Sequence, residues 1–230
     1  MINTKENKII NEKLLDLYKK HTNEYLREWT NAFYEDKEGS PGRINEFGII
    51  DENKYDSDKG ILFICRETNG WKNEDYAKGS LFRTWMQDIA DKGLANRGHI
   101  TTHPNMWYNI GRWTLLLQSP NTSLDKLVWE KEAAIAALGT IAFTNINKVR
   151  GENASRKEYN KLAYTQIAQE LLRQEIAIIN PKTIVCCGTW GPVSNVLGDY
   201  DGNVFRMYHP GARKSTKGML QELKEQIELT

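Results

Sequence analysis

The run Ile61-Leu62-Phe63-Ile64-Cys65 is entirely apolar, and it leads directly into the polar turn Arg66-Glu67-Thr68-Asn69-Gly70. An uninterrupted apolar run of this length is typical of a β-strand that is buried on both faces of a parallel sheet. Later apolar runs have the same character, and they cover residues 141–144, 183–188 and 204–208. The sequence therefore predicts four buried strands.

Segments with a helical spacing of apolar residues separate these strands. We expect helices over residues 7–33, 81–92, 125–138, 156–179 and 191–197, and irregular structure over 35–60 and 93–112. Strands that alternate with helices indicate a parallel sheet with helices on both faces. We therefore predict an α/β fold of three layers (α/β/α) around a central, mainly parallel four-stranded sheet. We expect residues 1–230 to form a single domain, with 1–58 as an N-terminal helical and loop extension.

The composition is that of an ordinary globular protein, because the 230 residues are 40% hydrophobic and 27% charged, with a net charge of +1. The chain has no apolar run long enough to cross a bilayer, and its polar start lacks the apolar region of a signal peptide. We therefore expect a cytoplasmic monomer without a membrane partner. Cys65, Cys186 and Cys187 lie in apolar runs, which predicts that they are small buried hydrophobic residues.

Polar residues follow each of the four predicted strands, in the segments 67–71, 145–148, 188–190 and 209–213. In a parallel α/β sheet, ligands bind outside the carboxyl ends of the strands. In the last segment Pro210 disfavours a helical backbone at His209, so the histidine is held in an extended or turn conformation at a strand end. The sequence thus predicts a binding site at this edge of the sheet.

These four strand ends, in this order, resemble the motifs of the uracil-DNA glycosylase superfamily, and its iron–sulfur branch most closely. The family's first motif is a strand followed by Gly-Glu-Ala-Pro-Gly, which resembles Ile61–Gly70, and its second motif, Thr-Asn-Val-Val-Lys, resembles Thr144–Lys148. A Pro-Lys strand that ends in glycine is similar to Asn180–Gly188, and a Tyr-His-Pro motif is similar to Tyr208–Pro210. The resemblance covers residues 60–215.

The sequence also departs from this family pattern. Val149 stands where the iron–sulfur branch has a cysteine, and the chain has only 3 cysteines, too few for a four-ligand cluster. We therefore expect no iron–sulfur centre, no other cofactor and no metal. Asn69 replaces the proline of the first motif, and Arg66 is an additional residue before Glu67. Arg213 occupies the place of an apolar wedge that the family inserts into DNA.

The resemblance implies a DNA glycosylase that flips out a uracil-like or otherwise modified pyrimidine and hydrolyses its N-glycosidic bond, which leaves an abasic site. Glu67 would position the water or stabilise the sugar cation, with Asn69 as the alternative residue for this role. His209 would donate a hydrogen bond to the departing base. Base repair and defence against modified viral DNA are both open as biological roles.

The resemblance also implies how the base is held. Asn145 carries a donor and an acceptor that can read a pyrimidine's Watson–Crick edge. Phe82, which follows Gly79-Ser80-Leu81 as in the family's Gly-x-Pro-Phe segment, would stack on the flipped base, and Gly70 and Trp71 would complete the pocket. The alternative for Phe82 is a core aromatic residue on a helix.

Two basic segments are the candidates for DNA contact. We expect Arg213 and Lys214 to enter the duplex or to hold phosphates, and we expect Ser215 on the same segment and Lys148 on the other to contact DNA. The alternative for these side chains is ordinary solvated charge. At the level of function, the alternative to a glycosylase is a catalytically inactive nucleic-acid-binding module on the same fold.

Overall fold

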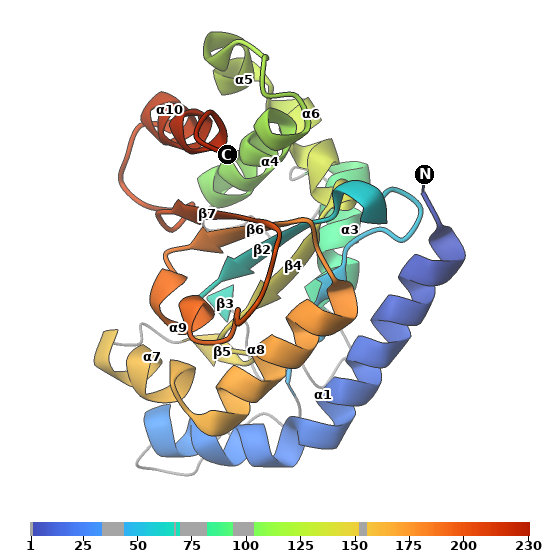
Figure 1. Cartoon of the computed structure of the whole chain (residues 1–230), viewed down its shortest axis with the longest axis vertical. Helices are drawn as coiled ribbons and strands as arrows, with labels where there is room; N and C mark the ends of the chain where they lie inside the picture. Colours follow the sequence, from blue (N-terminus) through green and yellow to red (C-terminus); the bar gives the residue numbers. More distant parts are fainter. Residues whose placement is uncertain (1, 34–43, 67, 70–81, 94–103, 152–155) are drawn as a thin grey trace.

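A computed structural model describes residues 2–33, 44–66, 68–69, 82–93, 104–151 and 156–230 (Figure 1). Its main sheet has five strands in the order β1-β4-β2-β6-β7. Their bounds are Gly48–Ile49 (β1), Ile61–Cys65 (β2), Ala142–Asn145 (β4), Thr183–Cys187 (β6) and Asn203–Met207 (β7). The four predicted strands pair in parallel, whereas β1 pairs antiparallel with β4. The α/β class is confirmed, but the sheet is mixed and has one edge strand more than predicted.

The missed strand β1 is only two residues long, so it carries no readable alternation of apolar and polar residues. A side chain from the first helix pairs with its backbone. The Asn11 amide nitrogen donates to the Ile49 carbonyl at 3.1 Å, and the Ile49 N–H donates to the Asn11 side-chain oxygen at 3.0 Å. Asn11 therefore satisfies the backbone of an edge strand that would otherwise offer free hydrogen-bonding groups.

Helices cover both faces of the sheet (Figure 1). Their bounds are Thr4–Phe33 (α1), Phe82–Lys92 (α3), Pro104–Gln118 (α4), Leu124–Trp129 (α5), Lys131–Ala137 (α6), Arg156–Ala163 (α7), Gln166–Ile179 (α8), Trp190–Ser194 (α9) and Thr216–Ile227 (α10). Helix α1 packs against α7 and α8, whereas α4 packs against α6 and α10, and α3 also contacts α6. This arrangement agrees with the predicted three layers.

Several helix boundaries differ from the prediction. Residues 93–112 were expected to be irregular, but α4 begins at Pro104, and proline suits the first turn of a helix, where no N–H is needed. The expected helix 156–179 is divided into α7 and α8, because the Thr165 hydroxyl accepts from the Ala168 N–H at 3.4 Å and starts a new helix. The expected helix 125–138 is likewise divided into α5 and α6, and α10 was missed.

The N-terminal segment is an integral part of the fold, although the sequence suggested an extension. Helix α1 packs on α8, and β1 belongs to the sheet. The three cysteines are free and buried, as predicted. No helix among the described residues is both long and apolar enough to span a bilayer.

Candidate functional site at the carboxyl edge of the sheet

The parallel register brings the predicted strand ends to one edge of the sheet. Cys65 lies opposite Asn145, and the chain beyond each strand stays paired, since the Asn147 N–H donates to the Arg66 carbonyl at 2.8 Å. Further along, β3 (Thr68–Asn69) pairs in parallel with β5 (Arg150–Gly151). The turns that carry the first and second motifs therefore run side by side. Glu67, Gly70, Trp71 and the side chain of Asn69 lie outside the described part of the chain.

The strand order reverses at β2, because the chain passes from β2 to β4 on one side and later to β6 on the other. Such a reversal opens a crevice at the carboxyl ends of the two diverging strands. A cavity of about 340 Å³ lies here, at the ends of β2 and β6. Its lining consists of Arg66, Tyr159, Asn160, Tyr164, Gly188, Gly191 and Pro192. The volume falls in the range of small-molecule sites, which is about 300–1,000 Å³.

Arg66 is the charged residue of this lining. Its guanidinium carbon lies 4.2 Å from the centroid of the Tyr159 ring, which is a cation–π contact. The Nε atom of Arg66 is buried and has no hydrogen-bond partner in the described structure. The other lining residues are neutral, so the described wall of the cavity carries a net positive charge. The sequence identified Arg66 only as an extra residue in a motif.

The tyrosines of the cavity were missed. Tyr159 lies on α7, and Tyr164 lies at the break between α7 and α8. Because the prediction treated this region as one continuous helix, it gave neither tyrosine a role. The signal that was available is Thr165, a good N-cap residue in the middle of the expected helix. A break there brings the end of α7 and its tyrosines to the cavity.

Gly188 connects the cavity to His209. Its φ of +73° lies in the left-handed region, which glycine adopts without strain. A Cβ atom at this position would lie 3.3 Å from the His209 backbone nitrogen, and the Gly188 N–H donates to the Met207 carbonyl at 2.7 Å. The glycine thus allows the ends of β6 and β7 to approach closely, and it puts His209 beside the cavity wall.

His209 is half-buried and forms the strand-end turn that the sequence predicted. The Gly211 N–H donates to the His209 Nδ1 at 3.1 Å, and the Ala212 N–H donates to the His209 carbonyl at 2.8 Å. Because Nδ1 accepts a hydrogen bond, the neutral ring carries its proton on Nε2. The turn therefore selects the tautomer of the neutral ring in which Nε2–H is a donor.

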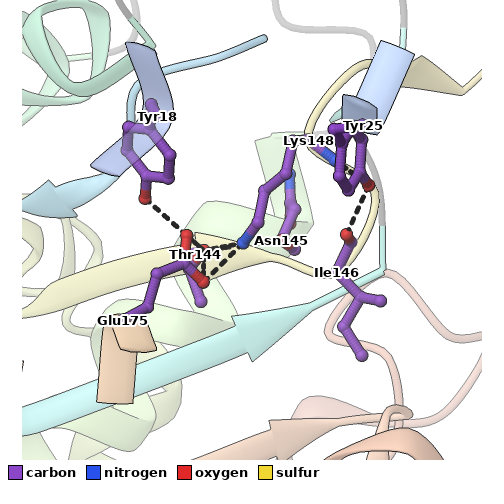
Figure 2. A network of polar contacts seen from close by, with 7 residues as sticks. All are labelled: Tyr18, Tyr25, Thr144, Asn145, Ile146, Lys148 and Glu175. Atoms are coloured by element: carbon purple, nitrogen blue, oxygen red, sulfur yellow. Dashed lines mark hydrogen bonds and ion pairs between the residues drawn. The ribbon is translucent and has the colours of Figure 1, made fainter. Parts of the chain in front are cut away.

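The end of β4 has a different character, because it is held by a buried polar network (Figure 2). The Lys148 ammonium donates to a Glu175 carboxylate oxygen at 2.6 Å and to the Thr144 hydroxyl at 2.7 Å. The Tyr18 hydroxyl donates to the other Glu175 oxygen at 2.5 Å. The side chains of Lys148 and Glu175 are 0% exposed. The prediction that Lys148 contacts DNA is therefore wrong, since its charge is paired inside the core.

Burial governs the titration of this network. It lowers the pKa of the Lys148 ammonium, although the Glu175 carboxylate opposes the shift. Burial, together with the charge of Glu175, raises the pKa of the Tyr18 hydroxyl well above its usual value. A second tyrosine holds the following turn, since the Tyr25 hydroxyl donates to the Ile146 carbonyl at 2.8 Å and accepts from the Lys148 N–H at 2.9 Å.

Two candidates for base recognition are buried. Asn145 ends β4 at the sheet edge as expected, but it is only 1% exposed. Phe82 is 2% exposed and stacks on Phe143 with ring centroids 5.3 Å apart, next to Phe47 and Trp107. The structure thus places Phe82 in the aromatic core, which corrects the expectation of a stacking platform. Its helical position and apolar neighbours made the two roles look alike in sequence.

The basic segment after His209 lies on the surface. Arg213 is exposed and makes no hydrogen bond or ion pair with the described residues. The Lys214 ammonium lies 3.2 Å from the centroid of the Tyr208 ring and 3.8 Å from a Glu222 oxygen. Ser215 is the N-cap of α10, where its hydroxyl accepts from the Gly218 N–H at 3.1 Å. Among the described residues of this segment, Arg213 is therefore the cation that has no ion pair or ring contact within the protein.

Two comparisons with known proteins add no assignment: no protein-family model matches the chain, and no curated protein is significantly similar to it. The described residues contain no group of three or more His, Cys, Asp or Glu side chains that is able to hold a metal ion. The candidate site is accordingly defined by its own geometry, which is a cavity with one cation at a strand reversal, bordered by a preset histidine.

Proposed function

We propose that the protein is a DNA glycosylase that excises a uracil-like or otherwise modified pyrimidine. The observation that carries the proposal is the turn of His209, in which Nδ1 is occupied by the Gly211 N–H and the proton is left on Nε2. Support also comes from the cavity beside this histidine at the strand reversal, where α/β sheets bind their ligands.

The proposed chemistry breaks the bond between C1′ of the deoxyribose and the ring nitrogen of the base. The bonding electron pair leaves with the base, and negative charge develops on a carbonyl oxygen of the base while the sugar takes on oxocarbenium character. The Nε2–H of His209 donates to that oxygen and stabilises the developing charge. A water molecule adds its oxygen to C1′ and releases a proton that ends on the departed base anion, and the resemblance assigns the positioning of this water to Glu67 or Asn69.

DNA contact is assigned to the exposed end of the segment after His209. Arg213 has no competing partner in the described structure, and a guanidinium is suited to phosphate contact or to stacking in the space that a flipped base vacates. Lys214 lies next to it and stacks on Tyr208. Lys148 has no part in this contact.

The test is an excision assay. The purified chain is incubated with duplexes that contain uracil, 5-hydroxymethyl or glucosylated pyrimidines, and alkali then cuts the strand at abasic sites. We expect cleavage of at least one substrate, and a loss of about 10²–10³-fold in rate for His209→Gln. His21→Gln is the matched control, because His21 lies on α1 and does not belong to the described cavity lining. Absence of abasic sites on every substrate would refute the proposal.

A second candidate function is a catalytically inactive nucleic-acid-binding module on the same fold. The observation in its favour is that Phe82 and Lys148, two residues expected at the site, are core residues. This alternative predicts salt-sensitive DNA binding that depends on Arg213, with no excision by the wild-type chain.

A further inference from the structure

The cavity at the ends of β2 and β6 has one feature that the excision chemistry does not use, which is the charge of Arg66. A base that receives a hydrogen bond from His209 needs further donors and acceptors, but it does not need a guanidinium in the wall of the adjoining cavity. Arg66 is also not explained as a structural ion pair, because no carboxylate pairs with it in the described part of the chain. A guanidinium that lines a cavity and has no carboxylate partner among the described residues is suited to binding an anion.

We propose that the cavity around Arg66 is an anion subsite that binds the phosphate of a nucleotide. The inference rests on the proposed function in one respect, namely that the phosphate belongs to DNA. Arg66 lies directly after β2, and its position between diverging strands is where α/β sheets bind nucleotides.

The first argument is the unsatisfied donor. The Nε–H of Arg66 is buried and has no partner among the described residues, so no hydrogen bond of the described protein holds the cation at this atom. The contact with the Tyr159 ring, at 4.2 Å from its centroid, holds the guanidinium carbon over the ring. The edge of a guanidinium matches the oxygens of a phosphate in a bidentate manner.

The second argument is the make-up of the remaining wall. The Asn160 amide and the Tyr164 hydroxyl belong to neutral side chains that are able to donate to an anion, and no acidic side chain is among the lining residues to repel one. Gly191 keeps the space open, because a Cβ atom there would lie 2.6 Å from the Tyr164 hydroxyl oxygen. A phosphate with its attached sugar is therefore accommodated in both charge and size.

The third argument is that the cavity and His209 lie next to each other at the edge of the sheet. Gly188 lines the cavity and also approaches the His209 backbone, so one nucleotide can reach both groups. With its phosphate at Arg66, its base would lie toward His209. The subsite thus anchors the backbone of the nucleotide whose base is removed, and it does so without contact to Lys148.

The test is a calorimetric titration of the full chain with thymidine, thymidine 5′-monophosphate and inorganic phosphate. We expect the monophosphate to bind at least about tenfold more tightly than thymidine, as for the gain of a charge-assisted hydrogen bond. Arg66→Gln should abolish that preference and Arg66→Lys should retain part of it. The matched control is Arg206→Gln, since Arg206 also stacks on an aromatic ring, Trp190, at 3.6 Å but does not line the cavity.

Three outcomes would overturn the inference. They are equal binding of thymidine and its monophosphate (including no binding of either), wild-type affinity for the monophosphate in Arg66→Gln, and binding of inorganic phosphate as tight as that of the monophosphate, which would assign the site to the free ion. Thermal unfolding checks that each variant is folded. Because the titration needs no excision, it can succeed where the glycosylase assay fails, and an active enzyme with unaltered binding in Arg66→Gln would refute the subsite alone.

Discussion

The two halves of the sheet's carboxyl edge are built in opposite ways. At the end of β4, Lys148 and Glu175 are fully buried, and every charge is paired within the protein (Figure 2). At the ends of β2 and β6 lies a cavity, and Arg66 in its wall has no counter-charge in the described structure. The contrast teaches that a polar strand end is not by itself a site. The residues that remain available to a ligand lie on the side where the strand order reverses.

The largest expected effect comes from substitutions in the buried Lys148–Glu175 network at the end of β4, which we call the closed half. Lys148→Met leaves the Glu175 carboxylate buried without its cation, which should lower the free energy of unfolding by about 3–5 kcal/mol. Replacing both partners, in Lys148→Met/Glu175→Leu, should recover most of that loss because no buried charge remains. Urea unfolding measures both variants.

A surface pair provides the control for this comparison. Lys217 and Asp125 are 2.6 Å apart but well exposed, so Lys217→Met should cost less than about 1 kcal/mol. If Lys148→Met lowered the free energy of unfolding no more than Lys217→Met, the buried ion pair would contribute no more stability than a surface pair.

A smaller effect is expected for the tyrosine of the same network. Tyr18→Phe removes the hydrogen bond to Glu175 and should cost about 1.5–3 kcal/mol near neutral pH. The pKa of Tyr18 is raised in the folded state, so its contribution is fully present below pH 10 and is lost as the pH rises toward the folded value.

The stability gap between the wild type and Tyr18→Phe should therefore narrow above about pH 10. Burial lowers the pKa of Lys148, so the free energy of unfolding rises with pH in a window below the usual lysine pKa. The wild type and Tyr18→Phe both contain Lys148, so this contribution does not change the gap between them. Urea unfolding at pH 8, 10 and 11 measures the gap, and a gap that stays constant would contradict the assignment.

The half with the cavity, at the ends of β2 and β6, is the open half. Its stability should respond to a substitution of Gly188. Gly188→Ala forces a left-handed backbone on a residue with a Cβ and crowds the His209 nitrogen, at a cost of about 1–2 kcal/mol from the backbone alone. Gly198→Ala is the matched control, because Gly198 also has a positive φ but its Cβ would meet nothing within 4 Å. Thermal unfolding compares the two, and an equal loss would show that the contact with His209 adds nothing.

The smallest effect on stability is expected at the surface. Arg213→Ala should change the free energy of unfolding by less than about 0.5 kcal/mol, because Arg213 is exposed. It should nevertheless weaken duplex binding and reduce the slope of log affinity against log salt by about 1. Fluorescence anisotropy at several salt concentrations measures this, and an unchanged slope would remove Arg213 from the DNA contact.

The four parallel strands were predictable because a strand buried on both faces is a continuous apolar run, as in Ile61–Cys65. Strand β1 was not, since Gly48 and Ile49 are specified by contacts with β4 and Asn11 rather than by a local pattern. His209 was recognised through the proline that follows it. Neither the burial of Lys148 nor the place of Arg66 in a cavity wall could be predicted, because each depends on partners far along the chain, such as Glu175 and Tyr159.

The most direct test of the contrast between the two halves is the excision rate of two variants on the best substrate of the wild-type chain. We predict that Lys148→Met/Glu175→Leu, which repacks the closed half, excises the base at a rate within about tenfold of the wild type. We predict that His209→Gln, in the open half, loses about 10²–10³-fold. The reverse order, with the double variant inactive while folded and His209→Gln active, would contradict the account.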